Sequence, residues 1–132
     1  MTEETILLRQ VHPSFLENGE ATSQAFFPFP KDKGLLSVDD GDLTTAAAAF
    51  THYTEKRKLE SAGTWGVSCA EVKSAELDYR ADPVAEDKAQ GIPANPAHAV
   101  VDFGERDEKA CRKLARKLKA YANSRKRLHP EA

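Results

Sequence analysis

The segment that most constrains the fold is residues 22–38, which read TSQAFFPFPKDKGLLSV. It holds three of the six phenylalanines and two of the seven prolines of the chain. It shows neither helical nor strand periodicity before Leu35. Because proline fixes the backbone and removes a hydrogen-bond donor, we predict a stiff loop here. Stiff aromatic loops are suited to walling a pocket or docking a partner, so we expect Ser23 and Phe26 to contact a binding partner.

Short strand patterns alternate irregularly with helical patterns along the rest of the chain. Strands are predicted at 5–12, 35–38, 64–70 and 97–103, helices at 44–59 and 107–127, a helical turn at 70–75 and a loop-rich excursion at 76–97. These irregular intervals favour a compact α+β domain over a doubly wound sheet. We predict a small mixed sheet of about four or five strands with two main helices, of which the last is long, basic and amphipathic.

Composition is that of a soluble globular protein, because 40% of the 132 residues are apolar and 30% are charged. The length fits one domain, residues 1–132, with its own core. An acidic start and the lack of any run of about 18 apolar residues argue against a secretory signal and a membrane span. Cys69 and Cys111 lack the spacing of a disulfide framework or a zinc motif. We therefore predict a cytoplasmic protein with no metal and no cofactor.

Charge is distributed unevenly between two parts of the chain. Residues 105–128 carry ten Lys or Arg against three Asp or Glu, whereas residues 1–104 carry nine against seventeen. We predict a basic C-terminal helix packed on an acidic body. Its cations, among them Arg116 and Lys117, are suited to neutralising phosphates of RNA or DNA through residues 109–127. They are also typical of a solvated helix face, and the acidic body disfavours a wide nucleic-acid footprint.

Three residues at predicted strand ends form the candidate catalytic set. Arg9 and His12 close the first strand and His98 opens the last one. If these strands are neighbours, a guanidinium and two imidazoles converge on one rim, where they can bind phosphate or carboxylate. Three residues of adjacent elements can join them as binding residues: Ser37, His52 and Tyr53. In the alternative interpretation Arg9 makes a surface ion pair and each histidine caps a strand end.

Ser37 also belongs to a residue type that serves as a nucleophile in hydrolases. Its neighbours, Leu36 and Val38, do not provide the Gly-x-Ser-x-Gly pattern of a nucleophile elbow. The sequence therefore favours an ordinary strand residue at this position.

Five motifs of the chain together carry a resemblance to a known family. They are LLRQVHP at 7–13, TSQAF at 22–26, PKD at 30–32, LSV at 36–38 and NPAHAVVDF at 95–103. This pattern resembles a family of small bacterial proteins with no assigned activity, and the likeness covers nearly all of the chain up to Phe103. Members of that family look like genomic companions of mobile-element or defence genes. The resemblance implies a bacterial accessory protein and no particular reaction.

A looser likeness is to small NAD-consuming toxins of the RES and ADP-ribosyltransferase-like type. A strand with an arginine, a Phe-containing loop, and a strand that enters a helix carry this likeness. It implies that Arg9 holds the pyrophosphate of NAD, that Tyr53 stacks on the nicotinamide ring, and that a carboxylate such as Glu55 or Glu71 polarises the ribose. The chain lacks the Gly-rich Arg-Trp segment of RES proteins, and the analogy operates at the level of the fold only.

Together these observations predict a small cytoplasmic bacterial accessory protein that binds a protein partner, in a defence or toxin-related operon. The alternative is a small enzyme that acts on a nucleotide or NAD, with its site at Arg9, His12 and His98. A second alternative is an RNA- or DNA-binding module that uses residues 109–127.

Overall fold

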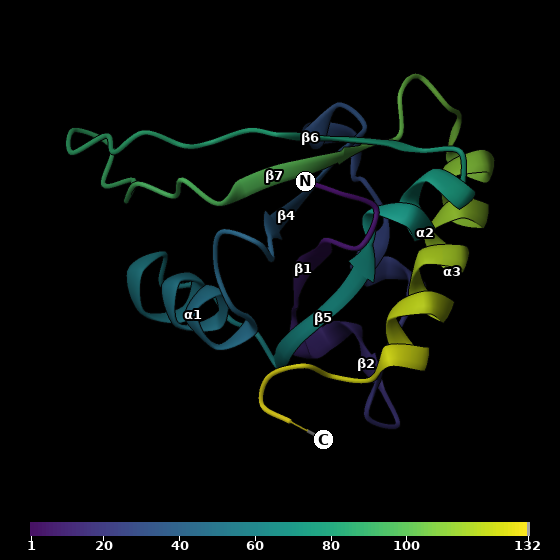
Figure 1. Ribbon diagram of the computed structural model, residues 1–132, viewed down its shortest axis with the longest axis horizontal. Coiled ribbons are helices and arrows are strands. Elements are labelled where there is room, and N and C mark those ends of the chain that lie inside the picture. The colour runs from purple at the N-terminus through teal and green to yellow at the C-terminus, as the bar shows by residue number, and fades with distance from the viewer. Residues whose placement is uncertain (132) are drawn as a thin grey trace.

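A computed structural model describes residues 1–131 and contains a five-stranded sheet, a two-stranded sheet and three α-helices (Figure 1). The strands are β1 (Ile6–Val11), β2 (Leu16–Glu17), β3 (Glu20–Ala21), β4 (Leu35–Asp40), β5 (Gly63–Ser68), β6 (Asp78–Ala81) and β7 (His98–Asp102). The α-helices are α1 (Ala46–Thr51), α2 (Cys69–Ser74) and α3 (Glu108–Arg125). Short 3₁₀ helices span Pro13–Phe15, Ser23–Phe26 and Pro30–Asp32, and a π-helical turn spans His52–Lys56. The predicted α+β fold with a long last helix is confirmed.

The larger sheet has the strand order β5-β1-β4-β7-β6, and all of its pairings are antiparallel. The expected mixed sheet is therefore corrected. The connection through α1 joins β4 to β5, and the connection through α2 joins β5 to β6. These strands are not neighbours in the sheet, so neither connection creates a parallel pair. β1 pairs with β5 along its whole length, but with β4 only at Leu7 and Leu8. The two central strands separate after Leu8, and the candidate site lies at this separation.

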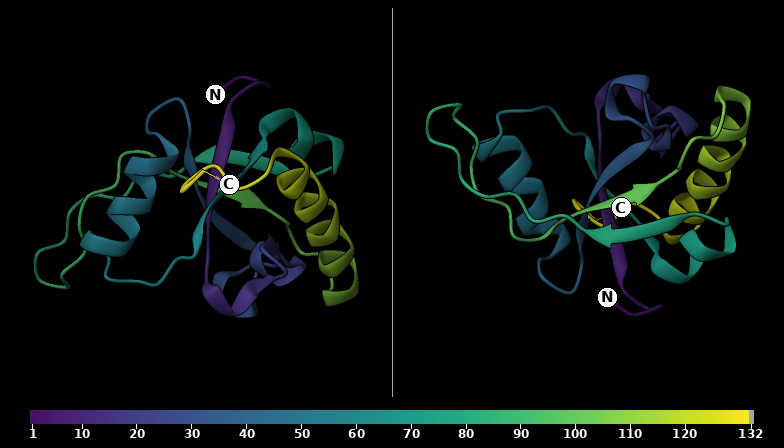
Figure 2. Two further views of the ribbon diagram at one scale, coloured as in Figure 1. Left: turned by 90° about the horizontal axis from the view of Figure 1, so that it is seen from below. Right: turned by 90° about the horizontal axis from the view of Figure 1, so that it is seen from above.

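One face of the sheet is covered by α3, α2 and the 3₁₀ helix at 23–26, and it carries the hydrophobic core (Figure 2). We call it the closed face. From α3, the side chains of Cys111, Ala115, Leu118 and Ala122 are buried, at the three- and four-residue steps of an amphipathic helix. No helix within residues 1–131 is long and apolar enough to cross a membrane.

The opposite face of the sheet is only partly covered, and we call it the open face. α1 lies against β5 and β1 on this side, so that α1 and α3 flank the sheet from opposite sides (Figure 2). Ser37 of β4 is exposed here, and Asp39 and His98 are half-buried. Polar side chains therefore occupy the middle of the open face, where the closed face has its core.

The β5 edge of the sheet is covered by another segment of the chain. At the β5 edge the segment after α3 runs alongside the strand, with Thr64 and His129 exchanging backbone hydrogen bonds. Gly63 allows this approach, because its φ is +153° and a Cβ there would lie 2.6 Å from the Cδ of Arg127.

At the other edge of the sheet, β6 falls within residues 76–97, which the sequence predicted to be a loop. Its four residues are mostly polar and exposed, so they lack the apolar alternation of a half-buried strand.

The aromatic segment at 22–38 is anchored by its own side chains. Phe26, expected to contact a partner, is fully buried in the core instead. Phe27 and Phe29 are half-buried, with ring centroids 5.6 Å apart, and Phe29 stacks on Phe15 at 6.2 Å. A protein partner at this segment stays a prediction, and Phe26 cannot be its contact in the folded state.

Candidate functional site

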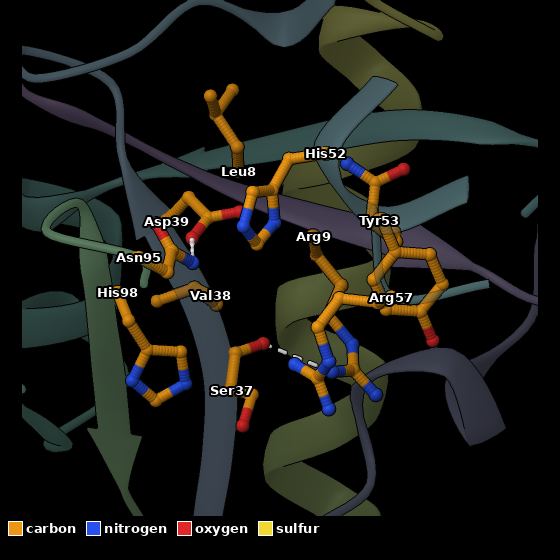
Figure 3. A pocket seen from close by; sticks show the side chains of 11 residues that line it. Leu8, Arg9, Ser37, Val38, Asp39, His52, Tyr53, Arg57, Asn95 and His98 are labelled. Atoms are coloured by element: carbon orange, nitrogen blue, oxygen red, sulfur yellow. Dashed lines mark hydrogen bonds between the residues drawn. The ribbon is translucent and has the colours of Figure 1, made fainter. Parts of the chain in front are cut away.

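A pocket lies on the open face of the sheet, where β1 and β4 separate and the π-helical turn approaches them (Figure 3). We call it the sheet pocket. β1, β4 and β7 form its floor, and the π-helical turn and the segment before β7 form its walls. The lining residues are Leu8, Arg9, Gln10, Ser37, Val38, Asp39, His52, Tyr53, Arg57, Asn95 and His98.

Arg9 bridges the gap between the separated strands. Its Nε donates to the carbonyl oxygen of Ala25 at 2.8 Å, and its Nη1 donates to that of Ser37 at 2.9 Å. The second bond takes the place of the ladder hydrogen bonds that β1 and β4 do not form here. Burial lowers the pKa of the Arg9 guanidinium from its ordinary value, against the opposing electrostatic effects of Tyr53 and Asp32. Because arginine stays protonated even so, Arg9 is a fixed cation in the pocket wall.

Gln10 also lines this pocket, and one end of its side-chain amide is unpaired, although the residue is only 8% exposed. Its Oε1 accepts hydrogen bonds from the hydroxyls of Ser61 at 2.8 Å and Thr64 at 3.0 Å. Its Nε2 is the one buried side-chain nitrogen or oxygen within residues 1–131 that has no hydrogen-bond partner. Turning the amide over exchanges its two ends, so one end lacks a partner in either orientation. An unpaired buried polar atom costs about 1–3 kcal/mol, which is why such atoms often mark functional positions.

The π-helical turn after α1 supplies a wall of the pocket. Thr45 caps the start of α1, because its hydroxyl accepts from the backbone N–H of Ala48 at 3.1 Å. The alanine run of α1 itself favours a helix. At the other end the N–H of Arg57 donates to the carbonyl of His52 at 3.0 Å, a five-residue step that widens the helix. π-helical turns are rare and frequently occur at functional sites. The widened turn places His52, Tyr53 and Arg57 along the pocket.

The segment between β6 and β7 is fastened over the other side of the pocket. The amide nitrogen of Asn95 donates to Asp39 Oδ1 at 2.8 Å, and His52 Nε2 lies 3.1 Å from the carbonyl oxygen of Ala94. In Figure 3 the Asp39 carboxylate and the Asn95 amide lie across the pocket from Arg57. The pocket therefore has an acidic side and a basic side.

His98 is the first residue of β7, and its side chain is 16% exposed. Its Nδ1 lies 2.8 Å from the carbonyl oxygen of Asp82 and 3.3 Å from the Oδ2 of the same residue. Both of these atoms only accept hydrogen bonds when the carboxyl is ionised, so Nδ1 carries the proton. Nε2 of the neutral ring is then an acceptor, and it has no hydrogen-bond partner within residues 1–131.

This arrangement can hold a small molecule by three kinds of contact. An anionic group fits beside Arg9 and Arg57, a planar ring fits against Tyr53, and a hydroxyl or amino group can donate to Asp39. Metal binding has no comparable basis, because no group of three or more His, Cys, Asp or Glu in the described chain is placed to hold an ion.

Five of the residues singled out in the sequence line the sheet pocket: Arg9, Ser37, His52, Tyr53 and His98. His12 does not, because it turns toward the 3₁₀ helix after β1. Its Nδ1 lies 2.7 Å from the Ser14 hydroxyl, and its Nε2 lies 3.8 Å from Glu60. His12 thus caps the 3₁₀ helix Pro13–Phe15, where its Nδ1 accepts from the backbone N–H of Ser14.

The other predicted binding residues lie away from the sheet pocket. Ser23 lines a separate hollow together with Phe27 and Phe29, and Arg116 and Lys117 are exposed on α3. Among the polar residues that line the sheet pocket, sequence reasoning missed four: Gln10, Asp39, Arg57 and Asn95. Only Gln10 carried a signal, since strand alternation places it on the same side as Leu8, a buried residue.

The glutamates named by the likeness to NAD-consuming toxins do not line the pocket. Glu71 accepts from the backbone N–H of Ser68 at 2.8 Å as part of the capping box of α2, and it pairs with Arg125 at 2.8 Å. Burial by itself raises the pKa of Glu71, but the hydrogen bonds from Arg125 and Ser68 outweigh this and lower it overall. Glu55 is exposed on the π-helical turn, so the acidic residue that lines the pocket is Asp39.

Comparison of the chain with models of protein families, with curated proteins and with solved structures finds no match. The resemblance to a family of bacterial accessory proteins therefore stays a prediction. What the fold and the site define is an α+β protein with an antiparallel sheet and a polar pocket, lined by two arginines, on the open face of that sheet.

Proposed function

We propose that this protein binds a small organic ligand with a phosphate or carboxylate group in the sheet pocket. The observation that carries the proposal is that two arginines, Arg9 and Arg57, line one pocket together with Gln10, a buried residue whose side-chain amide is unpaired at one end. A buried polar atom without a partner lowers stability unless a ligand completes its hydrogen bonding. Neither arginine forms an ion pair within residues 1–131, and such cations favour an anion as the ligand.

The two arginines contribute in different ways. Arg9 spends Nε and Nη1 on backbone carbonyls, so it acts mainly as a fixed charge. Arg57 is exposed and its side chain makes no hydrogen bond or ion pair within residues 1–131. Its planar fork of donors is thus available for bidentate contact with a phosphate or carboxylate.

The remaining lining residues favour a ligand with a nucleotide-like body. Tyr53 offers an aromatic surface beside the arginines, and Asp39 offers an acceptor for a hydroxyl or amino group on the far side. A ligand with a ring, donor groups and a terminal phosphate satisfies all of these contacts, and a simple dicarboxylate satisfies only the cationic side.

Isothermal titration calorimetry with adenosine monophosphate and with succinate tests the proposal and separates the two anion types. We expect saturable binding of the nucleotide, and at least tenfold weaker binding by Arg57→Ala, a loss of about 1.4 kcal/mol. Arg116→Ala is the matched control, because Arg116 is also an exposed arginine but lies on α3. Absence of binding by both probes, or equal losses in the two variants, would overturn the proposal.

Nucleic-acid binding through α3 is a second candidate function. Lys109, Lys113, Arg116 and Lys117 are exposed on this helix, and none of them forms an ion pair in the chain from residue 1 to 131. Such cations can neutralise backbone phosphates and release counterions. Fluorescence anisotropy with a single-stranded RNA should then show affinity that falls with salt, with a shallower slope in the double variant Arg116→Ala/Lys117→Ala. Affinity independent of salt would contradict this candidate.

A further inference from the structure

We infer that the sheet pocket is also a hydrolytic site, in which Ser37 is the nucleophile and His98 the general base for cleavage of a small carboxylic ester. The choice of an ester with an anionic group rests on the proposed function, because Arg57 holds that group. Labelling of Ser37 by an uncharged probe needs no anionic group for Arg57 to hold. The two parts can therefore be tested separately.

His98 is prepared to act as a base by the contacts of its other ring nitrogen. Nδ1 is held by Asp82, at 2.8 Å from the carbonyl oxygen and 3.3 Å from Oδ2. This fixes the ring and its tautomer, and it leaves the lone pair of Nε2 free to take a proton. Asp82 is thus a positioning residue, as the third member of a nucleophile–base–orienter arrangement.

The register of the sheet brings Ser37 within reach of this imidazole. Ser37 pairs with Val100 and Asp39 pairs with His98, so Ser37 and His98 are diagonal neighbours on the open face. Diagonal neighbours have Cα atoms about 7–8 Å apart, which ring-bearing side chains span. Ser37 is exposed, and its hydroxyl makes no hydrogen bond inside the described part of the chain. The nucleophile is therefore accessible and has no competing partner.

Arg9 supplies a positive charge at the reacting residue. Its Nη1 donates to the carbonyl oxygen of Ser37 itself, at 2.9 Å. In the view of Figure 3 the Ser37 side chain lies between the His98 ring and the guanidinium groups of Arg9 and Arg57. A fixed cation close to the serine stabilises the negative oxygen that develops when the hydroxyl attacks a carbonyl.

The reaction needs only the ester and water. Ser37 Oγ bonds to the carbonyl carbon, its proton passes to His98 Nε2, and the carbonyl electrons move to the oxygen beside Arg9. When the carbonyl reforms, the bond to the alcohol oxygen breaks and the alcohol takes the proton from His98. A water molecule then attacks the acyl-serine in the same way, which releases the acid and restores both side chains.

Labelling with a fluorophosphonate, followed by peptide mass spectrometry, tests the nucleophile directly. The probe forms a Ser37 Oγ–P bond and releases fluoride, and the hydroxyl proton passes to His98. We expect an adduct on Ser37 that is absent in Ser37→Ala and forms at least a hundredfold more slowly in His98→Asn. Asparagine keeps a nitrogen that can donate to Asp82 and lacks Nε2, so this variant retains the structural contact. Ser124→Ala, at an exposed serine of α3, is the control and should label as the wild type does.

Steady-state kinetics with 4-carboxyphenyl acetate and the uncharged phenyl acetate test the choice of substrate. We expect kcat/KM at least tenfold higher for the charged ester, and Arg57→Ala should remove this preference. Asp82→Asn should lower kcat with little change in KM, which a merely structural role does not predict.

The outcomes separate the two proposals. A wild-type protein that binds adenosine monophosphate but shows no adduct on Ser37, or labels equally fast in His98→Asn, overturns the hydrolytic inference alone. An adduct on Ser37 without anion binding and without preference for the charged ester overturns the proposed function instead.

Discussion

The two faces of the sheet are built from the same strands but carry opposite kinds of side chain. On the closed face Leu7 of β1 is fully buried under α3, without a polar atom to satisfy. On the open face Gln10 of β1 is buried with an unpaired amide, and Ser37 of β4 is exposed. The same backbone thus supports an apolar core on one side and a polar pocket on the other.

This difference shows where the chain gains stability and where it gives it up. Burial of apolar side chains is the main source of folding free energy, and it is concentrated on the closed face. On the open face β1 and β4 separate, and Arg9 has to replace the missing ladder hydrogen bonds. Native proteins keep such local conflicts mainly where they serve a function. The comparison therefore predicts large stability effects and no binding effects on one face, and the reverse on the other.

The largest effect is expected from Phe26→Ala on the closed face. Phe26 is fully buried, so the substitution leaves a cavity and should lower the free energy of unfolding by about 3–5 kcal/mol. Urea denaturation measures this loss. Phe29→Ala is the matched control, because Phe29 is only half-buried and should cost less. Equal losses in the two variants would contradict the placement of Phe26 in the core.

A smaller effect is expected from the ion pair between Glu71 and Arg125, which ties α2 to α3 on the closed face. Their side chains are 22% and 28% exposed, and Glu71→Gln should cost about 1–3 kcal/mol at neutral pH. Because the folded-state pKa of Glu71 is lowered, its contribution is present above the ordinary value of 4.5 and is lost as the pH falls through the folded-state pKa. The variant should therefore lose less stability than the wild type on acidification below about 4.5. Identical pH profiles of the variant and the wild type would contradict this account. The control is Asp78→Asn, at the exposed pair with Lys73, which should leave the free energy of unfolding and its pH profile nearly unchanged.

The smallest effect on stability is expected from Gln10→Met on the open face. The hydroxyls that donate to Gln10 have other acceptors, because Ser61 also reaches the carbonyl of Gly63 at 2.9 Å and Thr64 that of Ala46 at 3.4 Å. Removing the unpaired amide should keep the free energy of unfolding within about 1 kcal/mol of the wild type. Affinity for adenosine monophosphate should fall at least tenfold. A loss of stability above about 2 kcal/mol with affinity unchanged would show that the amide is structural.

The sequence predicted those elements whose local pattern agrees with their tertiary role. The helix at 107–127 was predicted because its apolar stripe becomes the buried face of α3, and the first strand because its residues alternate between two faces up to Pro13, which ends it. β6 was missed because its pairing with β7, not its own pattern, makes it a strand. The antiparallel sheet also depends on which strands are neighbours, and no local pattern records that.

The residues of the candidate site, too, could be predicted only where a local pattern marked them. Arg9 and His98 were chosen because polar residues at strand ends often meet, and Ser37, His52 and Tyr53 followed by adjacency in the chain. Arg57 could not be found in this way, because the π-helical turn that directs it to the pocket is set by packing and leaves no mark in the sequence. Phe26 was misplaced for a related reason, since composition shows that a loop is aromatic but not which ring turns inward.

The most direct test of the central claim is an NMR titration of the ¹⁵N-labelled protein with adenosine monophosphate. The account predicts saturable amide shifts that map to the sheet pocket, at Arg9, Ser37, Tyr53 and Arg57, with the amides of Arg116 and Lys117 on α3 unchanged. Shifts confined to α3, or no saturable shifts in the sheet pocket, would contradict it.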